Sequence, residues 1–380
     1  MKLSSAGSLF MDAYFCSLKI QEQYIQRCLQ LAAMGAGHVA PNPMVGAVLV
    51  YKDRIIGEGY HKKFGEAHAE VNCINSVAEA DRKLISESTV YVSLEPCAHF
   101  GKTPPCADLI IKNKIPKVVI GCRDSFEAVA GKGIERLKSA GAEVTVAVLE
   151  KDCLELNKRF FTFHEKKRPF IILKWAESSD GKIASLNLSQ GGTSEHAGSE
   201  RLLISNEFTN RLVHKWRGEE AAILVGTNTA LLDDPALTAR LWPGINPVRL
   251  VIDNNLKLPL HLKLFDGTVK TIVFNYLKKS EEENLVYYQL KKEENILTQI
   301  ATALYSMNIQ SVMVEGGAKL LQSFIDEGLW DEAWVISNEQ LTIGNGLNAP
   351  ILRSNKLYDE QKIQNDTISF FRNVAINKMY

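Results

Sequence analysis

Residues 94–106 read LEPCAHFGKTPPC and contain two cysteines, Cys97 and Cys106, each directly preceded by a proline. Upstream, residues 68–70 read HAE, so a histidine lies two positions before a glutamate. A catalytic zinc ion takes three protein ligands and keeps a fourth position open for water. One imidazole and two thiolates supply three such ligands. The pattern therefore predicts a zinc site formed by His68, Cys97 and Cys106.

Glu70 is the residue that we expect to transfer protons at this site. It follows His68 by two positions on the same expected helix, where a carboxylate can move protons without binding the metal. One histidine and two cysteines, with a His-x-Glu sequence, form the general pattern of zinc-dependent base deaminases. That pattern has two residues between the cysteines, whereas eight separate them here. Because His-x-Glu alone is common, the prediction rests on the whole set of residues.

The composition places limits on the class of protein. The chain has 380 residues, more than one typical core holds, which favours two domains. Its 44 basic and 44 acidic residues give zero formal net charge, so no overall basic field argues for a nucleic-acid partner. We find no apolar run long enough to span a bilayer and no typical signal peptide. Seven scattered cysteines then favour reduced thiols in the cytoplasm over disulfides.

Strand and helix patterns alternate in the first half, which predicts an α/β fold with a mostly parallel sheet. We expect helices at 21–35, 68–80, 106–112 and 133–139, and strands at 44–50, 55–60, 89–94, 117–122 and 143–149. A charged helix over 150–168 then ends at a proline, which marks the best candidate domain boundary.

The same alternation starts again after this boundary. We expect strands at 170–176, 221–226, 248–253, 269–274, 311–314, 333–336 and 368–374, and helices at 206–216, 294–306 and 318–327. The chain is therefore predicted to contain an extension at 1–20, a first domain at 21–150, a linker helix at 151–168 and a second domain at 169–380.

Longer segments around the zinc motif resemble the bifunctional deaminase–reductases of riboflavin biosynthesis. The matching segments of the first half are residues 41–46, 57–61, 68–71 and 94–106. The long loop between the two cysteines distinguishes this family from cytidine and tRNA deaminases. The resemblance implies that the first domain has the α/β/α fold of cytidine deaminases, and that zinc is its cofactor.

The resemblance continues through the second half. The matching segments there are residues 174–176, 179–184, 213–217, 223–229, 233–240 and 314–318. It implies an NADPH-dependent reductase domain with an α/β fold similar to dihydrofolate reductase. The chain lacks the Gly-x-Gly-x-x-Gly sequence of a classical dinucleotide-binding fold. Gly316 and Gly317 still suit a phosphate, because glycines between a strand and a helix let backbone N–H groups approach it.

The resemblance also implies roles for individual positions. The substrate-binding positions are Asn42, His61, His99 and Lys102 in the first domain, and Lys174, Arg217, Leu237, Arg240 and Glu315 in the second. The cofactor-binding positions are Ala176, Leu203, Thr229, Asp233, Asn254, Gly317, Ala318, Lys319, Leu320, Leu321, Gln322 and Ser323. Arg217 and Arg240 suit a ribose phosphate, because a guanidinium offers paired donors. Leu203 is a departure, since the family usually has an aromatic residue there.

The substrate implied by this resemblance is 2,5-diamino-6-ribosylamino-4(3H)-pyrimidinone 5′-phosphate. The first domain would remove its exocyclic 2-amino group by hydrolysis, with water activated by zinc and protons moved by Glu70. The second domain would use NADPH to reduce the ribosyl group to a ribityl chain. We expect a cytoplasmic homo-oligomer that binds this small molecule and neither nucleic acid nor a membrane.

The zinc motif also permits two other interpretations of the chain. The chain could be a nucleoside or tRNA-base deaminase with a non-catalytic second half, although its neutral charge and long inter-cysteine loop argue against this. It could also be a metal-stabilised scaffold or a nucleotide sensor. A structural zinc ion normally has four protein ligands, however, and the motif offers three. Zinc content measured together with ammonia release would separate these classes.

Overall fold

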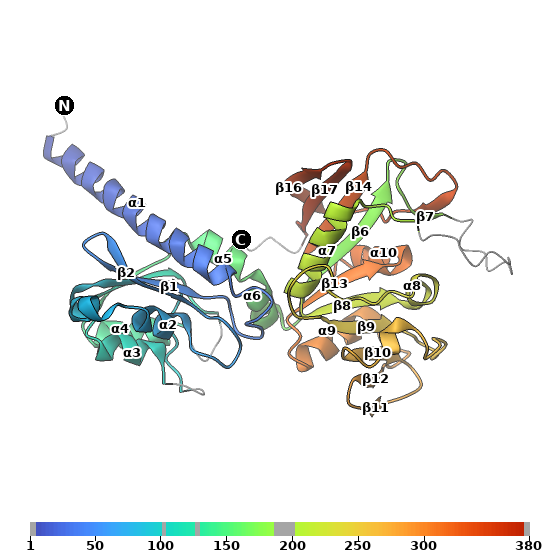
Figure 1. Cartoon of the computed structure of the whole chain (residues 1–380), viewed down its shortest axis with the longest axis horizontal. Helices are drawn as coiled ribbons and strands as arrows, with labels where there is room; N and C mark the ends of the chain where they lie inside the picture. Colours follow the sequence, from blue (N-terminus) through green and yellow to red (C-terminus); the bar gives the residue numbers. More distant parts are fainter. Residues whose placement is uncertain (1–4, 101–103, 126–129, 186–201, 376–380) are drawn as a thin grey trace. The chain divides into compact units, whose positions relative to one another are not determined.

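The computed structural model describes residues 5–100, 104–125, 130–185 and 202–375, with side chains from Lys19 onward (Figure 1). The chain forms two compact units, Met1–Lys166 and Lys167–Tyr380. Among the described residues, none of the helices combines the length and the apolar character needed to cross a membrane.

A five-stranded mixed sheet forms the centre of the first unit, in the order β2-β1-β3-β4-β5. Its strands are β1 (Gly46–Tyr51), β2 (Arg54–Tyr60), β3 (Thr89–Leu94), β4 (Lys117–Cys122) and β5 (Glu143–Val146). β1 pairs antiparallel with both β2 and β3, whereas β3, β4 and β5 run parallel. The central strands are apolar and buried on both faces, as expected for a sheet with helices on each side.

Helices cover both faces of this sheet (Figure 1). One face packs against α2 (Ala69–Asn75), η1 (Glu79–Glu87), α3 (Cys106–Lys112) and α4 (Lys132–Ser139). The other face packs against α1 (Ser5–Ala33), α5 (Glu150–Leu156) and α6 (Lys158–Lys166). Side chains of β1 alternate accordingly, with Leu49 in the first core and Val48 in the second. This is the α/β/α arrangement predicted for the first half.

The segment predicted as one linker helix over 150–168 differs in the structure. It forms two helices, α5 and α6, separated at Asn157. The Asn157 side chain accepts a hydrogen bond from Met44 N at 2.8 Å and donates one to Met44 O at 2.9 Å. Cys153 and Phe160 are buried in the first unit's core. The single helix was a wrong prediction, because the break depends on a contact with a residue far away in the sequence.

A ten-stranded sheet forms the centre of the second unit, in the order β11-β12-β10-β9-β8-β13-β6-β14-β17-β16, which Figure 1 shows from β16 at the top to β11 at the bottom. Its strands are β6 (Phe170–Ser178), β8 (Ala222–Gly226), β9 (Val248–Ile252), β10 (Thr271–Asn275), β11 (Ser280–Glu281), β12 (Leu285–Gln289), β13 (Ser311–Gly316), β14 (Glu332–Asn338), β16 (Asn355–Ile363) and β17 (Asp366–Asn373). The strands from β12 to β14 are parallel, and β11, β17 and β16 add antiparallel edges. A separate pair joins β7 (Lys182–Ser185) to β15 (Gly346–Asn348).

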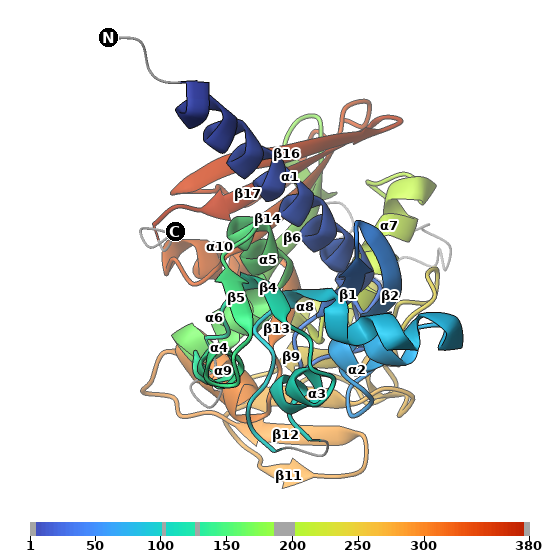
Figure 2. The ribbon, with the colours of Figure 1, turned by 90° about the vertical axis from the view of Figure 1, so that its left-hand side faces the viewer.

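Helices also cover both faces of the second sheet. α9 (Ile296–Ser306) and α10 (Ala318–Asp326) pack on the face that includes Leu173. α7 (Glu207–Glu219), α8 (Thr227–Asp233) and η3 (Lys263–Phe265) pack on the face that includes Ile172. Figure 2 shows α9 and α10 on one side of this sheet and α7 on the other. The second half is thus an α/β unit with its own core, as predicted.

Candidate active sites

Three possible metal ligands meet where α2 and α3 begin in the first unit. His68 is the N-cap residue of α2, and Cys106 is the first residue of α3. Cys97 lies in the loop after β3. The Nδ1 atom of His68 is 3.7 Å from Cys97 Sγ and 3.4 Å from Cys106 Sγ. All three ligand atoms lie within 4.8 Å of one another.

The spacing of these atoms fits a tetrahedral zinc ion. Zinc lies about 2.0–2.1 Å from a histidine nitrogen and about 2.3 Å from a thiolate, so neighbouring nitrogen and sulfur ligands are roughly 3.6 Å apart. The two distances from His68 bracket this value. The Cys106 N–H also donates to Cys97 Sγ at 3.3 Å. A hydrogen bond from the Cys106 thiol, together with His68, lowers the pKa of Cys97 against the effect of burial, which favours the thiolate at this ligand.

Glu70 lies in the first turn of α2 and is 3% exposed. Burial, reinforced by the nearby Cys97, raises the pKa of its carboxyl group to about 7. A carboxyl group that titrates near neutral pH can accept a proton and later return it. Glu70 therefore has the properties of a proton-transfer group beside the three ligands.

His61 lies against the metal ligand His68, and Asn42 contacts His61. The His61 ring makes an edge-on contact with the His68 ring at a centroid distance of 5.4 Å. His61 Nδ1 lies 3.1 Å from Ala67 O, and a carbonyl only accepts, so we assign the ring proton to Nδ1. Nε2 then accepts from Asn42 Nδ2 at 3.1 Å. Burial lowers the pKa of His61, which favours this neutral form.

The loop between the two cysteines contains the other two predicted substrate residues of the first unit. His99 is exposed in this loop, and Lys102 lies outside the described residues. The structure therefore places His61 against His68 and Asn42 against His61, and His99 is an exposed residue of the loop between the two cysteines.

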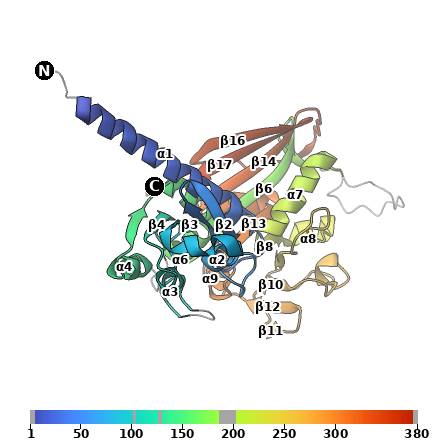
Figure 3. The ribbon, with the colours of Figure 1, turned by 60° about the vertical axis from the view of Figure 1, so that its left-hand side comes forward.

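Glu95 was not selected from the sequence, yet it fixes the start of this loop. Its side chain is buried, and Oε1 accepts from Gly133 N at 3.0 Å and from Ile134 N at 3.3 Å. Oε2 accepts from Gly131 N at 3.0 Å. These bonds tie the residue two positions before Cys97 to the start of α4, which lies beside α3 (Figure 3). A carboxylate directly after a buried strand was the signal available in the sequence.

A buried charged cluster lies in the second unit. Glu315, near the end of β13, accepts from Arg217 through both oxygens, with Nε–Oε1 at 2.7 Å and Nη2–Oε2 at 2.6 Å. Burial alone would raise the pKa of Glu315, but Arg217 and Lys174 lower it to about 2. Arg217 Nη1 also donates to Thr238 O at 3.4 Å. The predicted substrate residues Lys174, Arg217 and Glu315 are thus neighbours, and the Arg217 guanidinium is directed to Glu315.

A turn with two glycines joins β13 to α10. Gly317 is the N-cap residue of α10, so backbone N–H groups of the first turn are available to an anion. A Cβ atom on Gly317 would lie 3.2 Å from Thr229 Oγ1, which places α8 against this turn. Further along, Leu321 is buried in the core and Gln322 accepts from Ile351 N at 2.9 Å. The side chains of Leu321 and Gln322 are thus held by the second unit itself, and the unpaired backbone N–H groups lie at the start of α10.

Two of the remaining predicted positions lie at the carboxyl edge formed by β9, β8, β13 and β6, which are adjacent and parallel. Ala176 is near the end of β6 and Asn254 follows β9, whereas Asp233 lies one helix beyond β8, at the end of α8. Open α/β sheets bind ligands at this edge. Asn254 Oδ1 is buried without a hydrogen-bond partner, as expected for a group that a ligand would satisfy.

Residues 233–240 and Leu203 complete the predicted set. Leu237 is buried, whereas Asp233 and Arg240 are exposed. Leu203, at the position where an aromatic residue was expected, is 69% exposed. Its side chain therefore lies on the surface of the second unit.

His214 on α7 was not selected from the sequence. It is 1% exposed, and its Nδ1 atom has no hydrogen-bond partner. Burial, together with the charges of Arg217 and Arg240, lowers its pKa to about 4. A neutral imidazole therefore lies beside the charged cluster of the second unit. Its pattern in the sequence, a histidine on an amphipathic helix, did not distinguish it from a solvated residue.

Comparison with known proteins identifies the family. The RibD C-terminal domain family matches residues 169–358, and the cytidine and deoxycytidylate deaminase zinc-binding region matches residues 18–122. The chain is 38% identical to the riboflavin biosynthesis protein RibD of Aquifex aeolicus over 93% of its own length and 99% of that protein. The chain belongs to the RibD family.

Other members of the RibD family agree with this result. The chain is 34% identical to RibD of Escherichia coli over 82% of its length and 85% of that protein. A crystal structure of a diaminohydroxyphosphoribosylaminopyrimidine deaminase/5-amino-6-(5-phosphoribosylamino)uracil reductase from Thermotoga maritima superposes with a TM-score of 0.83. The two chains are 35% identical, and the matched region covers 94% of this chain and 99% of the Thermotoga maritima chain. The structure of RibD from Acinetobacter baumannii has a TM-score of 0.80 and is 30% identical. The match covers 93% of this chain and 99% of that chain.

Membership of the RibD family confirms the predicted function class. The chain is a bifunctional deaminase and reductase of riboflavin biosynthesis, with a zinc-dependent deaminase part and an NADPH-dependent reductase part. Its N-terminal part has the cytidine-deaminase fold and its C-terminal part the RibD reductase fold, similar to dihydrofolate reductase. The interpretations as a base deaminase with an inactive second half, or as a scaffold, are therefore wrong.

Proposed function

We propose that the chain deaminates 2,5-diamino-6-ribosylamino-4(3H)-pyrimidinone 5′-phosphate and then reduces the ribosyl group of the product to ribityl. The observation that carries this proposal is the set of three closely spaced zinc-ligand atoms beside the buried carboxyl group of Glu70. The relative from Thermotoga maritima bears the names of these two activities, which supports the same substrate.

In the deaminase reaction, His68, Cys97 and Cys106 would hold the zinc ion. Zinc, when bound, would lower the pKa of a water molecule to near 7. Glu70 is suited to take a proton from the attacking water and to pass it to the departing ammonia, because its carboxyl group is buried close to the metal ligands and burial raises its pKa. Neutral His61, which contacts His68, and its neighbour Asn42 would orient the pyrimidine, together with His99 and Lys102 from the long loop.

In the reductase reaction, NADPH would supply a hydride to C1′ of the opened ribose. We assign its phosphates to Gly317, Ala318 and Lys319 at the start of α10, beside Thr229. The remaining cofactor contacts are assigned to Ala176 and Asn254 at the carboxyl edge of the sheet and to Asp233 at the end of α8.

The substrate of the reductase would lie against the charged cluster. Lys174 and the Arg217–Glu315 ion pair would contact the ribose, with Leu237 beside them. The Nε and Nη2 donors of Arg217 are already directed to the two Glu315 oxygens. For this reason we assign the phosphate to Arg240 in preference to Arg217. Arg240 is an exposed residue, and a guanidinium offers paired donors that match phosphate oxygens.

The roles of the two units, the partners and the location follow from this function. We assign deamination to the first unit and reduction to the second, on the basis of their separate cores and motifs. We propose a cytoplasmic homo-oligomer whose partners are small molecules, with neither nucleic acid nor membrane among them.

A turnover assay tests the proposed function. The purified chain is incubated with the diaminopyrimidinone phosphate, with and without NADPH, and ammonia and product masses are measured. Without NADPH we expect ammonia and the mass of the product in which oxygen replaces the amino group. With NADPH we expect two additional hydrogens. Absence of ammonia release from zinc-loaded protein would contradict the proposed substrate.

A further inference from the structure

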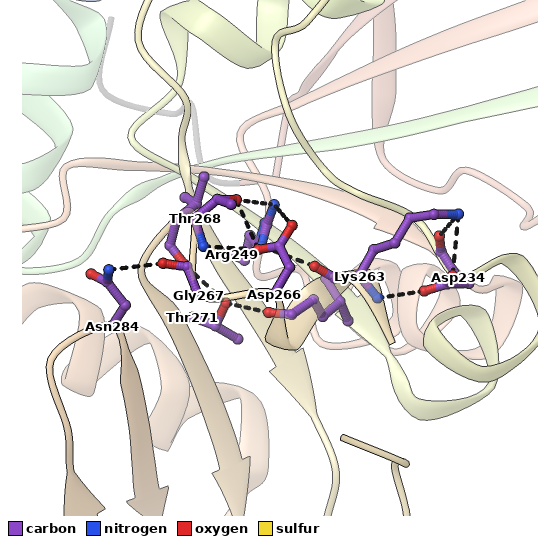
Figure 4. A network of polar contacts seen from close by, with 10 residues as sticks. Asp234, Arg249, Lys263, Asp266, Gly267, Thr268, Thr271 and Asn284 are labelled. Atoms are coloured by element: carbon purple, nitrogen blue, oxygen red, sulfur yellow. Dashed lines mark hydrogen bonds and ion pairs between the residues drawn. The ribbon is translucent and has the colours of Figure 1, made fainter. Parts of the chain in front are cut away.

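A buried arginine anchors a surface segment of the second unit to its sheet (Figure 4). Arg249 lies on β9 and is fully buried. Its Nη1 donates to Asp266 Oδ1 at 2.6 Å and to Lys263 O at 3.0 Å, and its Nη2 donates to Asp266 Oδ2 at 3.3 Å. Nη2 also donates to Thr268 Oγ1 at 3.3 Å. The guanidinium therefore fixes residues 263–268 through both main-chain and side-chain acceptors.

Lys263 extends this network to the end of α8. Its backbone N–H donates to Asp234 Oδ1 at 2.7 Å. Its Nζ lies 3.1 Å from Asp234 Oδ2 and donates to Asp234 O at 3.3 Å. Figure 4 shows the Lys263 side chain directed to Asp234. One lysine thus binds the carboxylate and the main chain of the same residue.

Asp234 is a residue whose conformation needs such support. It is the C-cap of α8, with a φ of 38° in the left-handed region. Residues other than glycine adopt this region rarely, and neighbouring contacts must hold them there. The preceding residue, Asp233, is the one that we assign to NADPH. The direction in which α8 ends therefore depends on the contacts of Asp234.

We propose that Lys263 is a positioning residue of the reductase, which fixes the Asp234 turn and thereby the orientation of Asp233 towards NADPH. The inference rests on the proposed role of Asp233. Lys263 and Asp234 are 61% and 35% exposed, and ion pairs this exposed add little to the stability of a whole domain. The contact instead acts on the local geometry of one turn, which Arg249 connects to the rigid sheet.

The test compares NADPH binding in variants of the full chain by titration calorimetry. Lys263→Met removes the ammonium group but keeps the backbone bond to Asp234, and should weaken NADPH binding about three- to tenfold. Lys263→Arg retains a cation and should restore most of the affinity. Asp234→Asn should resemble Lys263→Met, and the double variant should be no worse than either single one. Lys291→Met is the matched control, because it removes an exposed lysine 2.6 Å from Glu294 in the same unit.

Two further measurements separate positioning from general destabilisation. In the absence of NADPH, Lys263→Met should increase hydrogen exchange at residues 233–240, with an unchanged midpoint of thermal unfolding. Ammonia release by the same variant should also be unchanged, since Lys263 lies in the second unit.

Several outcomes would overturn the inference. The first is that Lys263→Met binds NADPH as tightly as the parental chain does. A loss that Lys263→Arg fails to restore, and that follows a lower unfolding midpoint, is another. Unchanged binding by Asp233→Ala would also overturn it, while leaving the reductase function intact. Failure of the proposed function is recognised separately, because the parental chain would then fail to bind NADPH.

Discussion

Burial has a larger effect on Glu70 than any neighbouring charge, and it gives this carboxyl group a pKa near that of a histidine. Glu70→Gln keeps the shape of the side chain but cannot exchange protons. We expect deamination to fall by at least ~10²-fold, because general acid–base catalysis contributes about that much. Ammonia release measures the loss, and metal analysis of the same sample should find zinc retained.

NADPH-dependent reduction of the deaminated product is the control for this variant, and it should be unaffected. Normal ammonia release would exclude Glu70 as the proton carrier. Loss of zinc from the variant would show instead that Glu70 supports the metal ligands.

His214 gives the second unit a pH dependence that can be tested directly. Its folded pKa of about 4 lies below the ordinary value of 6.5, so the unfolded chain binds more protons between these two values. The stabilising contribution of neutral His214 is therefore complete above pH 6.5 and is lost as pH falls towards 4. We expect the unfolding free energy to fall by on the order of 2–3 kcal/mol between pH 6.5 and pH 4.

The measurement is urea unfolding of the second unit at several pH values, in the parental chain and in His214→Gln. The difference in unfolding free energy between them should shrink as the pH falls from 6.5 to 4. A constant difference over this range would mean that His214 titrates alike in the folded and unfolded chain.

At the scale of secondary structure, strong local patterns were sufficient for prediction. α3 and β4 have the predicted bounds, because each is a short apolar segment ended by polar or turn residues. His68 and Cys106 were correctly predicted to begin helices. The missed elements are short or polar. β16, for example, is exposed along almost its whole length and has no apolar alternation to reveal it.

Long-range contacts explain the remaining differences between sequence and structure. Glu95 binds backbone groups near residue 133, and Asn157 binds Met44, so neither role leaves a local signal. The pairing of Arg217 with Glu315 joins residues 98 positions apart. The sequence was sufficient to select both residues as candidates, but their contact depends on how α7 packs against the end of β13.

The junction between α5 and α6 provides a prediction at this scale. Asn157 is 2% exposed and makes two hydrogen bonds to Met44. Asn157→Ala would leave the Met44 N–H and C=O without partners, and we expect the first unit to lose about 2–3 kcal/mol of unfolding free energy. Chemical denaturation of the zinc-loaded chain measures this change in unfolding free energy.

Asn157→Asp is the matched control, because it can still accept from Met44 N–H but cannot donate to Met44 C=O. Its carboxylate would be buried and would face the Met44 carbonyl oxygen, so it too should be less stable than the parental chain. Equal stability of all three proteins would show that the junction is not held by this side chain.

At the scale of the whole molecule, the two units have separate cores, and the candidate residues of each reaction lie within one unit. Two active sites of this kind should be separable by mutation. Cys97→Ser removes one zinc ligand from the first unit, so it should abolish deamination. Given the deaminated aminouracil phosphate, the same variant should still oxidise NADPH, which absorbance measures.

The reciprocal variant completes this test. Asp233→Ala combined with Arg240→Ala should still release ammonia but accumulate the unreduced intermediate, which mass analysis detects. Loss of the Arg240 guanidinium should cost about 1.5–3 kcal/mol if it binds the phosphate, a ten- to hundredfold effect at subsaturating substrate. If Cys97→Ser stays folded but loses both activities, the reactions cannot be independent. Reduction would then depend on an intact zinc site, and one unit would have to control the other.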